Sequence, residues 1–275
     1  MSICISWTAR VNERIRTLLR KEFLDLARNM TALAPVAIVT VVGLVLPFVV
    51  AVIIPAVSGQ SLGQDVGLSR ISGVAHPPDA LSDDARVQFF LFEQFLVLFL
   101  LTPITGAMVL AAHSVVGEKQ SKALEPLLAT PITTLELLAA KLFGAAVPTF
   151  AISFIGLALY GAGIVAFGLP GVAQAMVNLR SLLLVLWLSP AAGLVSLQSA
   201  VLISSRVNDP RTAQQWGVLI IAPLSGLFIA QLMGSLWFSS KALALIGAGL
   251  LVVWMLLLLF SVALFERETI LTRWR

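Results

Sequence analysis

Long apolar stretches alternate with short polar ones along the chain. A transmembrane helix needs about 20 consecutive apolar residues, and six stretches reach that length. They cover approximately residues 33–57, 87–115, 142–168, 181–203, 216–238 and 242–265. A helix satisfies its own backbone hydrogen bonds in lipid, whereas a transmembrane β-barrel needs alternating segments of about ten residues, and we find none in the sequence. The pattern predicts an all-α, polytopic membrane protein whose transmembrane domain spans residues 33–265.

The composition agrees with this class. The 275 residues are 59% hydrophobic and 12% charged, whereas a soluble domain is about 25% charged. The single Cys excludes an intramolecular disulfide and a Cys-based metal cluster. The two His residues lie far apart and give no metal-ligand spacing. We attribute the net charge of +4 to membrane topology and not to nucleic-acid binding.

Lys and Arg are distributed unevenly between the two sides of the predicted membrane domain. Such residues accumulate in cytoplasmic segments near the ends of spans. One side holds Arg10, Arg14, Arg16, Arg20, Lys21, Arg28, Lys119, Lys122, Lys141, Arg206, Arg211, Arg267, Arg273 and Arg275. The other side holds only Arg70, Arg86, Arg180 and Lys241. We therefore expect both termini to be cytoplasmic.

Segments 1–32 and 266–275 flank the membrane domain. Within the first, residues 9–30 place apolar side chains at helical spacing and basic ones on a different face. Such a helix lies in the headgroup region or packs on another protein beneath the membrane. We expect segment 1–32 to be an amphipathic interfacial helix and segment 266–275 to be a cytoplasmic tail.

Prolines occur within most predicted spans. A proline inside a helix removes one backbone hydrogen bond and kinks the helix, and transporters use such breaks as gates. The prolines concerned are Pro47, Pro103, Pro148, Pro190 and Pro223.

A few polar or small residues within the spans are candidate functional groups. Glu93 is the only carboxylate there, and ionisable residues inside a membrane are often functional. Either Glu93 lies at the interface, where it reaches water or pairs with Arg86 seven residues earlier, or it lines the exit of a transport path. Gln94 and Gln231 are weaker candidates for such a path. Small residues on one helix face allow close helix contacts, which here would be a subunit contact or packing within the chain. This stripe is formed by Gly226, Ala230 and Gly234.

The sequence lacks the motifs of common catalytic sites. It contains no phosphate-binding Gly-x-x-x-x-Gly-Lys-Ser/Thr, no Gly-x-Ser-x-Gly and no His-Glu-x-x-His. We therefore expect this chain to bind no cofactor or metal and to catalyse no reaction alone.

A polar, helix-prone segment, residues 117–141, connects the second and third spans on the predicted cytoplasmic side. Its charges alternate with leucines, and prolines predict a short helix, a turn and then the start of the third span. Such a segment is suited to docking a soluble partner, or else it is an ordinary interfacial loop. The residues that we expect to make this contact are Glu118, Lys119, Lys122, Leu124, Glu125, Leu127, Leu128, Thr130 and Pro131.

This segment resembles the permease subunits of ABC-2 type transporters. Those proteins carry a Glu-Lys/Arg pair, then Gly-Thr-Leu-Glu-x-Leu-Leu, a small residue, Thr-Pro and a Gly-Lys pair. The chain has Glu118-Lys119, Leu124-Glu125-x-Leu127-Leu128, Ala129-Thr130-Pro131 and Ala140-Lys141. It departs from the pattern by Lys122-Ala123 in place of Gly-Thr, by Pro126 within the motif and by Ala140 in place of Gly. The segments before the first span and after the fourth are similar to the family as well.

The resemblance implies a role and a set of partners. Two permeases would pair in the lipid of a plasma membrane (a bacterial inner membrane), and two separate ATPase subunits would bind below with ATP and Mg²⁺. A short coupling helix at about 119–130 would transmit ATPase closure to the spans and drive export. Alternatives from other classes are an ion-coupled secondary transporter, a non-transporting scaffold or assembly factor that docks an ATPase, and an intramembrane enzyme.

Overall fold

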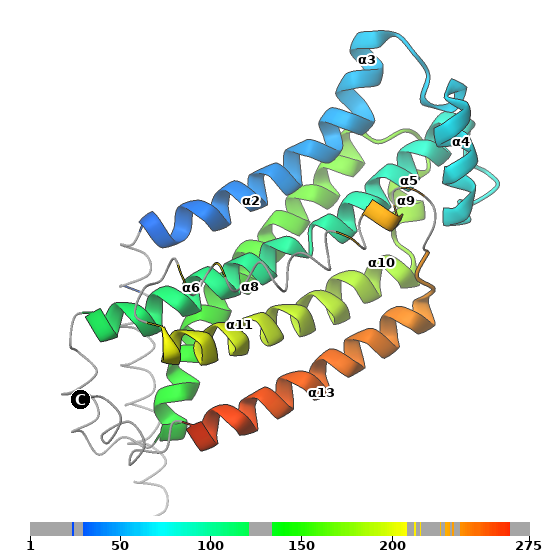
Figure 1. Cartoon of the computed structure of the whole chain (residues 1–275). Helices are drawn as coiled ribbons and strands as arrows, with labels where there is room; N and C mark the ends of the chain where they lie inside the picture. The colour runs from blue at the N-terminus through cyan, green and yellow to red at the C-terminus, as the bar shows by residue number, and fades with distance from the viewer. Residues whose placement is uncertain are drawn as a thin grey trace, which may run out of the picture.

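The fold is seen in a computed structural model of the chain, drawn in Figure 1. It describes residues 24, 30–120, 134–207, 212, 215, 226, 229–231, 233 and 237–264. Within these residues every regular element is a helix and there is no strand. The all-α prediction is therefore confirmed for this part of the chain.

Five helical stretches are long and apolar enough to cross a membrane, and they correspond to predicted spans one, two, three, four and six. They are Leu33–Ser58, Asp83–Ser114, Lys141–Phe167, Leu179–Ser204 and Ser240–Ser261. Predicted span 5, residues 216–238, lies mostly outside the described residues, as do the amphipathic segment 1–32 and the tail 266–275. The number six is therefore not tested by the structure.

Span 1 contains an irregular turn between two prolines. It consists of α2 (Met30–Phe48), the π-helix η1 (Val49–Ile53) and α3 (Ile54–Ser58). Pro55 has no N–H to donate to the carbonyl of Ala51 four residues earlier. That carbonyl instead accepts a hydrogen bond from Gln88 Nε2 at 3.1 Å. A side chain of span 2 thus bonds to the backbone at the irregular turn.

Span 2 is broken near its middle. Ser82 caps the N-terminus of helix α5 (Asp83–Leu98), since its hydroxyl accepts from the N–H of Ala85. Helix α6 (Leu101–Gln120) follows α5 end to end (Figure 1). The two residues between the helices form a turn, in which the N–H of Thr102 bonds to the carbonyl of Phe99 at 3.0 Å. The two halves of this span have largely different neighbours, although α2 packs against both.

The remaining spans differ in regularity. Span 3 is a single helix, α8 (Thr134–Phe167), which continues through Pro148. Span 4 consists of α10 (Leu179–Leu183), the π-helix η4 (Leu184–Leu188) and α11 (Ser189–Arg206). Span 6 is α13 (Ser240–Leu264). Short elements at one end of the bundle are η2 (Leu62–Gln64), α4 (Val66–Ser72), η3 (Gly73–Ala75) and α9 (Val172–Met176).

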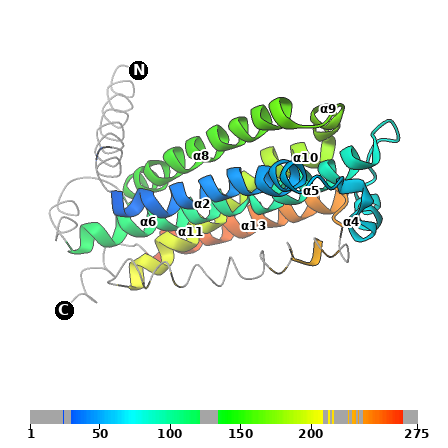
Figure 2. The ribbon, with the colours of Figure 1, turned by 90° about the horizontal axis from the view of Figure 1, so that it is seen from above.

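Span 2 is the centre of the bundle. In an apolar stretch of 18 residues in span 2, 83% of the residues are buried, whereas the corresponding shares for spans 1, 3 and 6 are 17%, 22% and 11%. Helix α6 packs against α11, α8 and α2, and α13 packs on α11. The long helices run side by side, with α4 and α9 gathered at one end (Figures 1 and 2). The segment joining spans 1 and 2 is predicted to be external, so we call this end the outer end and the opposite one the inner end.

Candidate functional site

A cluster of polar side chains surrounds Glu93 of α5 inside the bundle. The side chain of Glu93 is 1% exposed. Its Oε2 forms an ion pair with Nη1 of Arg180. Its Oε1 accepts hydrogen bonds from Asn178 Nδ2 at 2.7 Å and Ser181 Oγ at 3.1 Å. Each carboxylate oxygen therefore has at least one donor, which compensates the loss of hydration of a buried charge.

The start of span 4 places these donors. Asn178 caps α10 by accepting from the N–H of Ser181 at 2.8 Å, a usual role of Asn at a helix N-terminus. The same residue also donates to Glu93, so the first turn of α10 is held against α5. Arg180, which is 7% exposed, lies in that turn.

Arg180 also contacts the segment that precedes span 6. Its Nε donates to the carbonyl of Phe238 at 3.2 Å, and its guanidinium carbon lies 3.8 Å from the ring centroid of Trp237. Such a cation–π contact is favourable. Trp237 in turn stacks on Phe90 of α5, with ring centroids 6.2 Å apart. One guanidinium thus joins span 2, span 4 and the entry to span 6.

The expected pairing of Glu93 with Arg86 is wrong. Arg86 lies at the outer surface, where its Nη atoms are 4.0 Å from a carboxylate oxygen of Asp79 and 3.9 Å from one of Asp83. Its Nη2 also donates to the backbone carbonyl of Asp79 at 2.9 Å. Glu93 does not reach the protein surface, because residues at the start of span 4 enclose its side chain. Whether it lines a transport path stays a prediction.

The two candidate glutamines are buried as well. Gln94 is 0% exposed and Gln231 is 1% exposed. Within the described part of the chain, neither the amide nitrogen nor the amide oxygen of Gln94 has a hydrogen-bond partner, and Oε1 of Gln231 has none. Buried polar groups of this kind are usually bonded, so these two residues stay candidates for contact with water or a passing solute.

Sequence reasoning missed Gln88 as a connecting residue. It is 3% exposed, and besides its bond to Ala51 its Oε1 accepts from the N–H of Leu169 at 2.7 Å. It therefore joins spans 1 and 2 to the segment after span 3. A Gln about 1.4 turns before Glu93, on a helix that carries a buried charge, was the available signal. The contacts of Gln88 with distant backbone atoms required the structure.

The predicted small-residue stripe is only partly described. Gly226 is exposed and Ala230 is half-buried, whereas Gly234 lies outside the described residues. A Cβ atom added at Gly226 would meet no described atom within 4 Å. The stripe therefore stays a prediction, either as a subunit contact or as packing within the chain.

The predicted coupling segment lies between two long helices. Glu118 and Lys119 belong to the last turn of α6, and α8 begins at Thr134. Near this end Nζ of Lys141 donates to the carbonyl of Ser114 at 3.4 Å, which joins the two helices. The other predicted contact residues lie outside the described residues; they are Lys122, Leu124, Glu125, Leu127, Leu128, Thr130 and Pro131.

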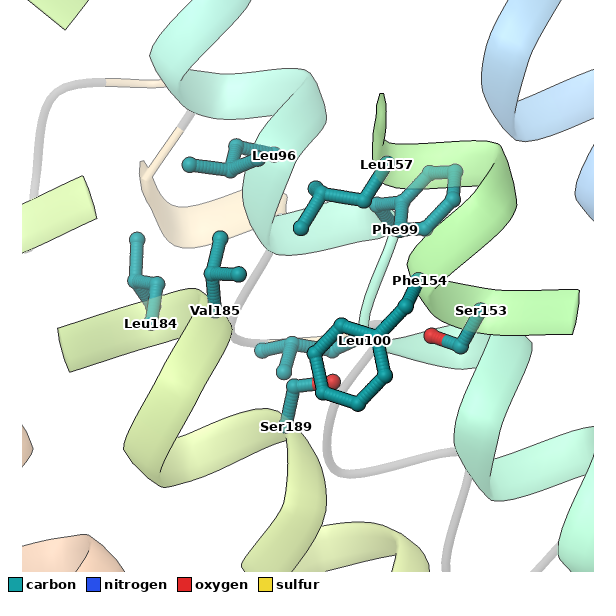
Figure 3. A pocket seen from close by; sticks show the side chains of 9 residues that line it. All are labelled: Leu96, Phe99, Leu100, Ser153, Phe154, Leu157, Leu184, Val185 and Ser189. Atoms are coloured by element: carbon teal, nitrogen blue, oxygen red, sulfur yellow. The ribbon is translucent and has the colours of Figure 1, made fainter. Parts of the chain in front are cut away.

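Described residues line hollows at two places that bear on the candidate site. One, of about 460 Å³, opens at the outer end beside Arg86 and His76. The other, of about 10 Å³, lies at the break in span 2 and is drawn in Figure 3. In the described residues no group of three or more His, Cys, Asp or Glu side chains is arranged to hold a metal ion.

Comparison with known proteins identifies the family. No curated protein and no solved structure matches the chain significantly. A family sequence model described as "ABC-2 family transporter protein" matches residues 78–265, which is more than half of the chain and includes segment 117–141. This match agrees with the resemblance seen in that segment and with the five apolar helices. The chain therefore belongs to the ABC-2 transporter family, as a multi-pass membrane permease.

Proposed function

We propose that the chain is the permease subunit of an ATP-driven exporter. The match over residues 78–265 carries the proposal, because it covers predicted spans 2 to 6 together with segment 117–141. Permeases of this family associate with an ABC ATPase. In the proposal, ATP and Mg²⁺ bind on that separate ATPase subunit, and this chain contributes no catalytic group.

Segment 117–141 is the proposed contact with the ATPase. Helices α6 and α8 flank it and pack against each other. The bond between Lys141 and Ser114 holds their ends together. A force applied to the segment would consequently move both helices, and the nucleotide would bias the two states of the permease.

A second permease and membrane lipid are the other proposed partners. Large apolar side chains are exposed along α2, α8 and α13, including Ile38, Ile155 and Leu256. In a bilayer such side chains contact lipid or another transmembrane helix. We place the protein in the plasma membrane with both termini cytoplasmic, because Lys and Arg gather on that side.

The test is assembly with an ATPase that has a Walker A motif and no membrane span, encoded beside this chain. Charge reversal by Glu118→Arg, or burial of a charge by Leu127→Asp, should abolish co-purification or lower permease-dependent ATP hydrolysis at least several-fold. The measurements are the ATPase-to-permease ratio and the hydrolysis rate in proteoliposomes.

Lys241→Glu is the matched control, because it reverses a charge on the exposed start of α13 at the other end of the bundle. It should assemble and hydrolyse ATP as the wild type does. Normal assembly and activity in both coupling-segment variants would contradict the docking assignment. If the ATPase forms a stable complex with the wild type or any variant of this permease, but its rate of ATP hydrolysis does not change on binding, the chain would instead be a non-transporting scaffold.

A further inference from the structure

We propose that span 2 is a two-part lever with a hinge at Phe99–Leu100. In this arrangement α6 moves with the coupling segment while α5 stays fixed to the outer end of the bundle. The inference rests on the proposed function, because it needs a force applied at the inner end. It identifies the place where that force is converted into a change of shape.

The break has a local cause in Pro103. This residue has no N–H to donate to the carbonyl of Phe99, and its ring crowds that carbonyl. The Phe99 carbonyl accepts from Thr102 instead, in a tighter turn, and the N–H of Leu100 bonds to Val97 at 3.1 Å. Helices bend readily at such positions. The angle between α5 and α6 can therefore change here without breaking a backbone hydrogen bond from Pro103 to Phe99, because that bond does not exist.

The outer half is anchored on three sides. Gln88 bonds to Ala51 of span 1 and to Leu169 after span 3. The carbonyl of Phe92 accepts from the hydroxyl of Tyr160 on α8 at 2.8 Å, and Glu93 is paired with Arg180. Separating α5 from these neighbours would leave buried polar groups without partners, which is costly.

The inner half belongs to a different set of neighbours. Helix α5 packs against η2, α4, α9, η1 and η4, whereas α6 packs against α11 and α8, and α2 is the neighbour that both halves share. The buried apolar residues also divide into two clusters. We call them the outer and the inner cluster, after the end of the bundle at which each lies. Among the residues of span 2, the last member of the outer cluster is Leu100 and the first member of the inner cluster is Ala107. The hinge therefore coincides with the boundary between two packed units.

The surroundings of the hinge allow adjustment. The small hollow lies between the break, α8 and the π-helix of span 4 (Figure 3). It holds about one water-sized sphere, and the hydroxyl-bearing residues Ser153 and Ser189 are among its lining residues. On the α8 side, a Cβ at Gly156 would come within 2.8 Å of the Phe99 ring. Two helix irregularities thus meet beside a hollow with room for about one water molecule, while the Phe99 ring itself packs closely on Gly156.

The test compares the two halves of span 2 against one continuous reference helix, α13. In a Cys4→Ser background, one spin-label pair replaces Asp83 and Lys241 at the outer end, and another replaces His113 and Leu259 towards the inner end. Labelled permease is diluted with unlabelled permease and purified with its ATPase. Distances are measured by double electron–electron resonance with and without a non-hydrolysable ATP analogue.

The expected result is a nucleotide-dependent shift of about 2 Å or more for the inner pair and none for the outer pair. Equal shifts of both pairs, or no shift in a complex that hydrolyses ATP, would overturn the hinge and leave the proposed function standing. Failure to form any complex with an ATPase would overturn the proposed function, and the lever with it.

A second variant tests the cause. Pro103→Ala restores the missing donor and favours a continuous helix, so the outer and inner pairs should then shift together or not at all. Pro148→Ala is the control, because Pro148 lies inside the unbroken α8. A wild-type pattern of shifts in Pro103→Ala would contradict the hinge.

Discussion

Glu93 and Arg180 illustrate how a pair of opposite charges is accommodated inside the bundle. Each is almost fully buried, and the two pair with each other and bond to neighbouring polar groups, although Nη2 of Arg180 has no hydrogen-bond partner among the described residues. Removing one partner of a buried pair leaves an uncompensated charge and costs about 3–5 kcal/mol. We therefore expect Arg180→Ala to lower the midpoint of thermal unfolding in detergent by several degrees or to prevent purification of folded protein.

Arg86→Ala is the matched control for this prediction. The ion pairs of Arg86 are near 4 Å and involve exposed aspartates, so they contribute little. The double variant Glu93→Leu with Arg180→Leu should regain part of the loss, since it removes both charges. Equal unfolding midpoints for Arg180→Ala and Arg86→Ala would show that the buried pair does not stabilise the fold.

The sequence identified Glu93 correctly as an unusual residue but not its partner. Helical spacing places Arg86 on the same face of span 2, and only local spacing is visible in a sequence. Arg180 is 87 positions away and reaches Glu93 because Asn178 fixes the first turn of α10 against α5. Contacts set by the packing of distant helices cannot be derived from periodicity alone.

Helix packing can be tested with two neighbouring glycines of α8. A Cβ at Gly163 would lie 2.4 Å from the ring of Phe48 in span 1, whereas one at Gly161 would meet nothing within 4 Å. Gly163→Ala should therefore force spans 1 and 3 apart and cost about 1–3 kcal/mol. Gly161→Ala should be neutral or slightly stabilising, because Ala favours helix.

The measurement is the unfolding midpoint of each purified variant in the same detergent. Gly163→Ala should unfold at a lower temperature than the wild type, and Gly161→Ala at the same or a higher one. The reverse order would mean that the close approach of Phe48 to α8 does not exist in the membrane protein.

Prolines predicted the positions of irregular helices only in part. The irregularities in spans 1, 2 and 4 lie next to Pro47, Pro103 and Pro190, but α8 continues through Pro148. A proline removes one hydrogen bond in every case. Whether the helix then breaks depends on its neighbours, such as the Gln88 amide that bonds to the π-helix of span 1.

At the scale of the whole molecule, the sequence predicted the class of fold but not which span lies at the centre. Spans 1 and 6 have a higher mean hydropathy than span 2, yet they are among the least buried. In lipid the most apolar helices face outwards, and polar groups such as Glu93 and Gln94 turn inwards. The feature of the sequence that indicates the central position of span 2 is therefore its charged residue Glu93, and not its mean hydropathy.

The proposed orientation gives a prediction for the whole molecule. Segment 117–141 must face the cytoplasm if a soluble ATPase docks there, whereas the connection between spans 1 and 2 must face outwards. In a Cys4→Ser background, a membrane-impermeant maleimide should label Gln60→Cys in intact cells, since Gln60 is exposed at the outer end. Ser121→Cys, which follows the end of α6, should be labelled only after the membrane is permeabilised.

Val252→Cys separates exposure to water from exposure to lipid. Val252 lies midway along α13 and is 61% exposed on the bare protein. Thiolates, which react with maleimides, do not form in hydrocarbon, so this variant should stay unlabelled in both conditions. Labelling of Ser121→Cys in intact cells would place the coupling segment outside, where no cytoplasmic ATPase reaches it. Labelling of Val252→Cys would instead reveal a water-filled surface on α13 and move the proposed lipid contact elsewhere.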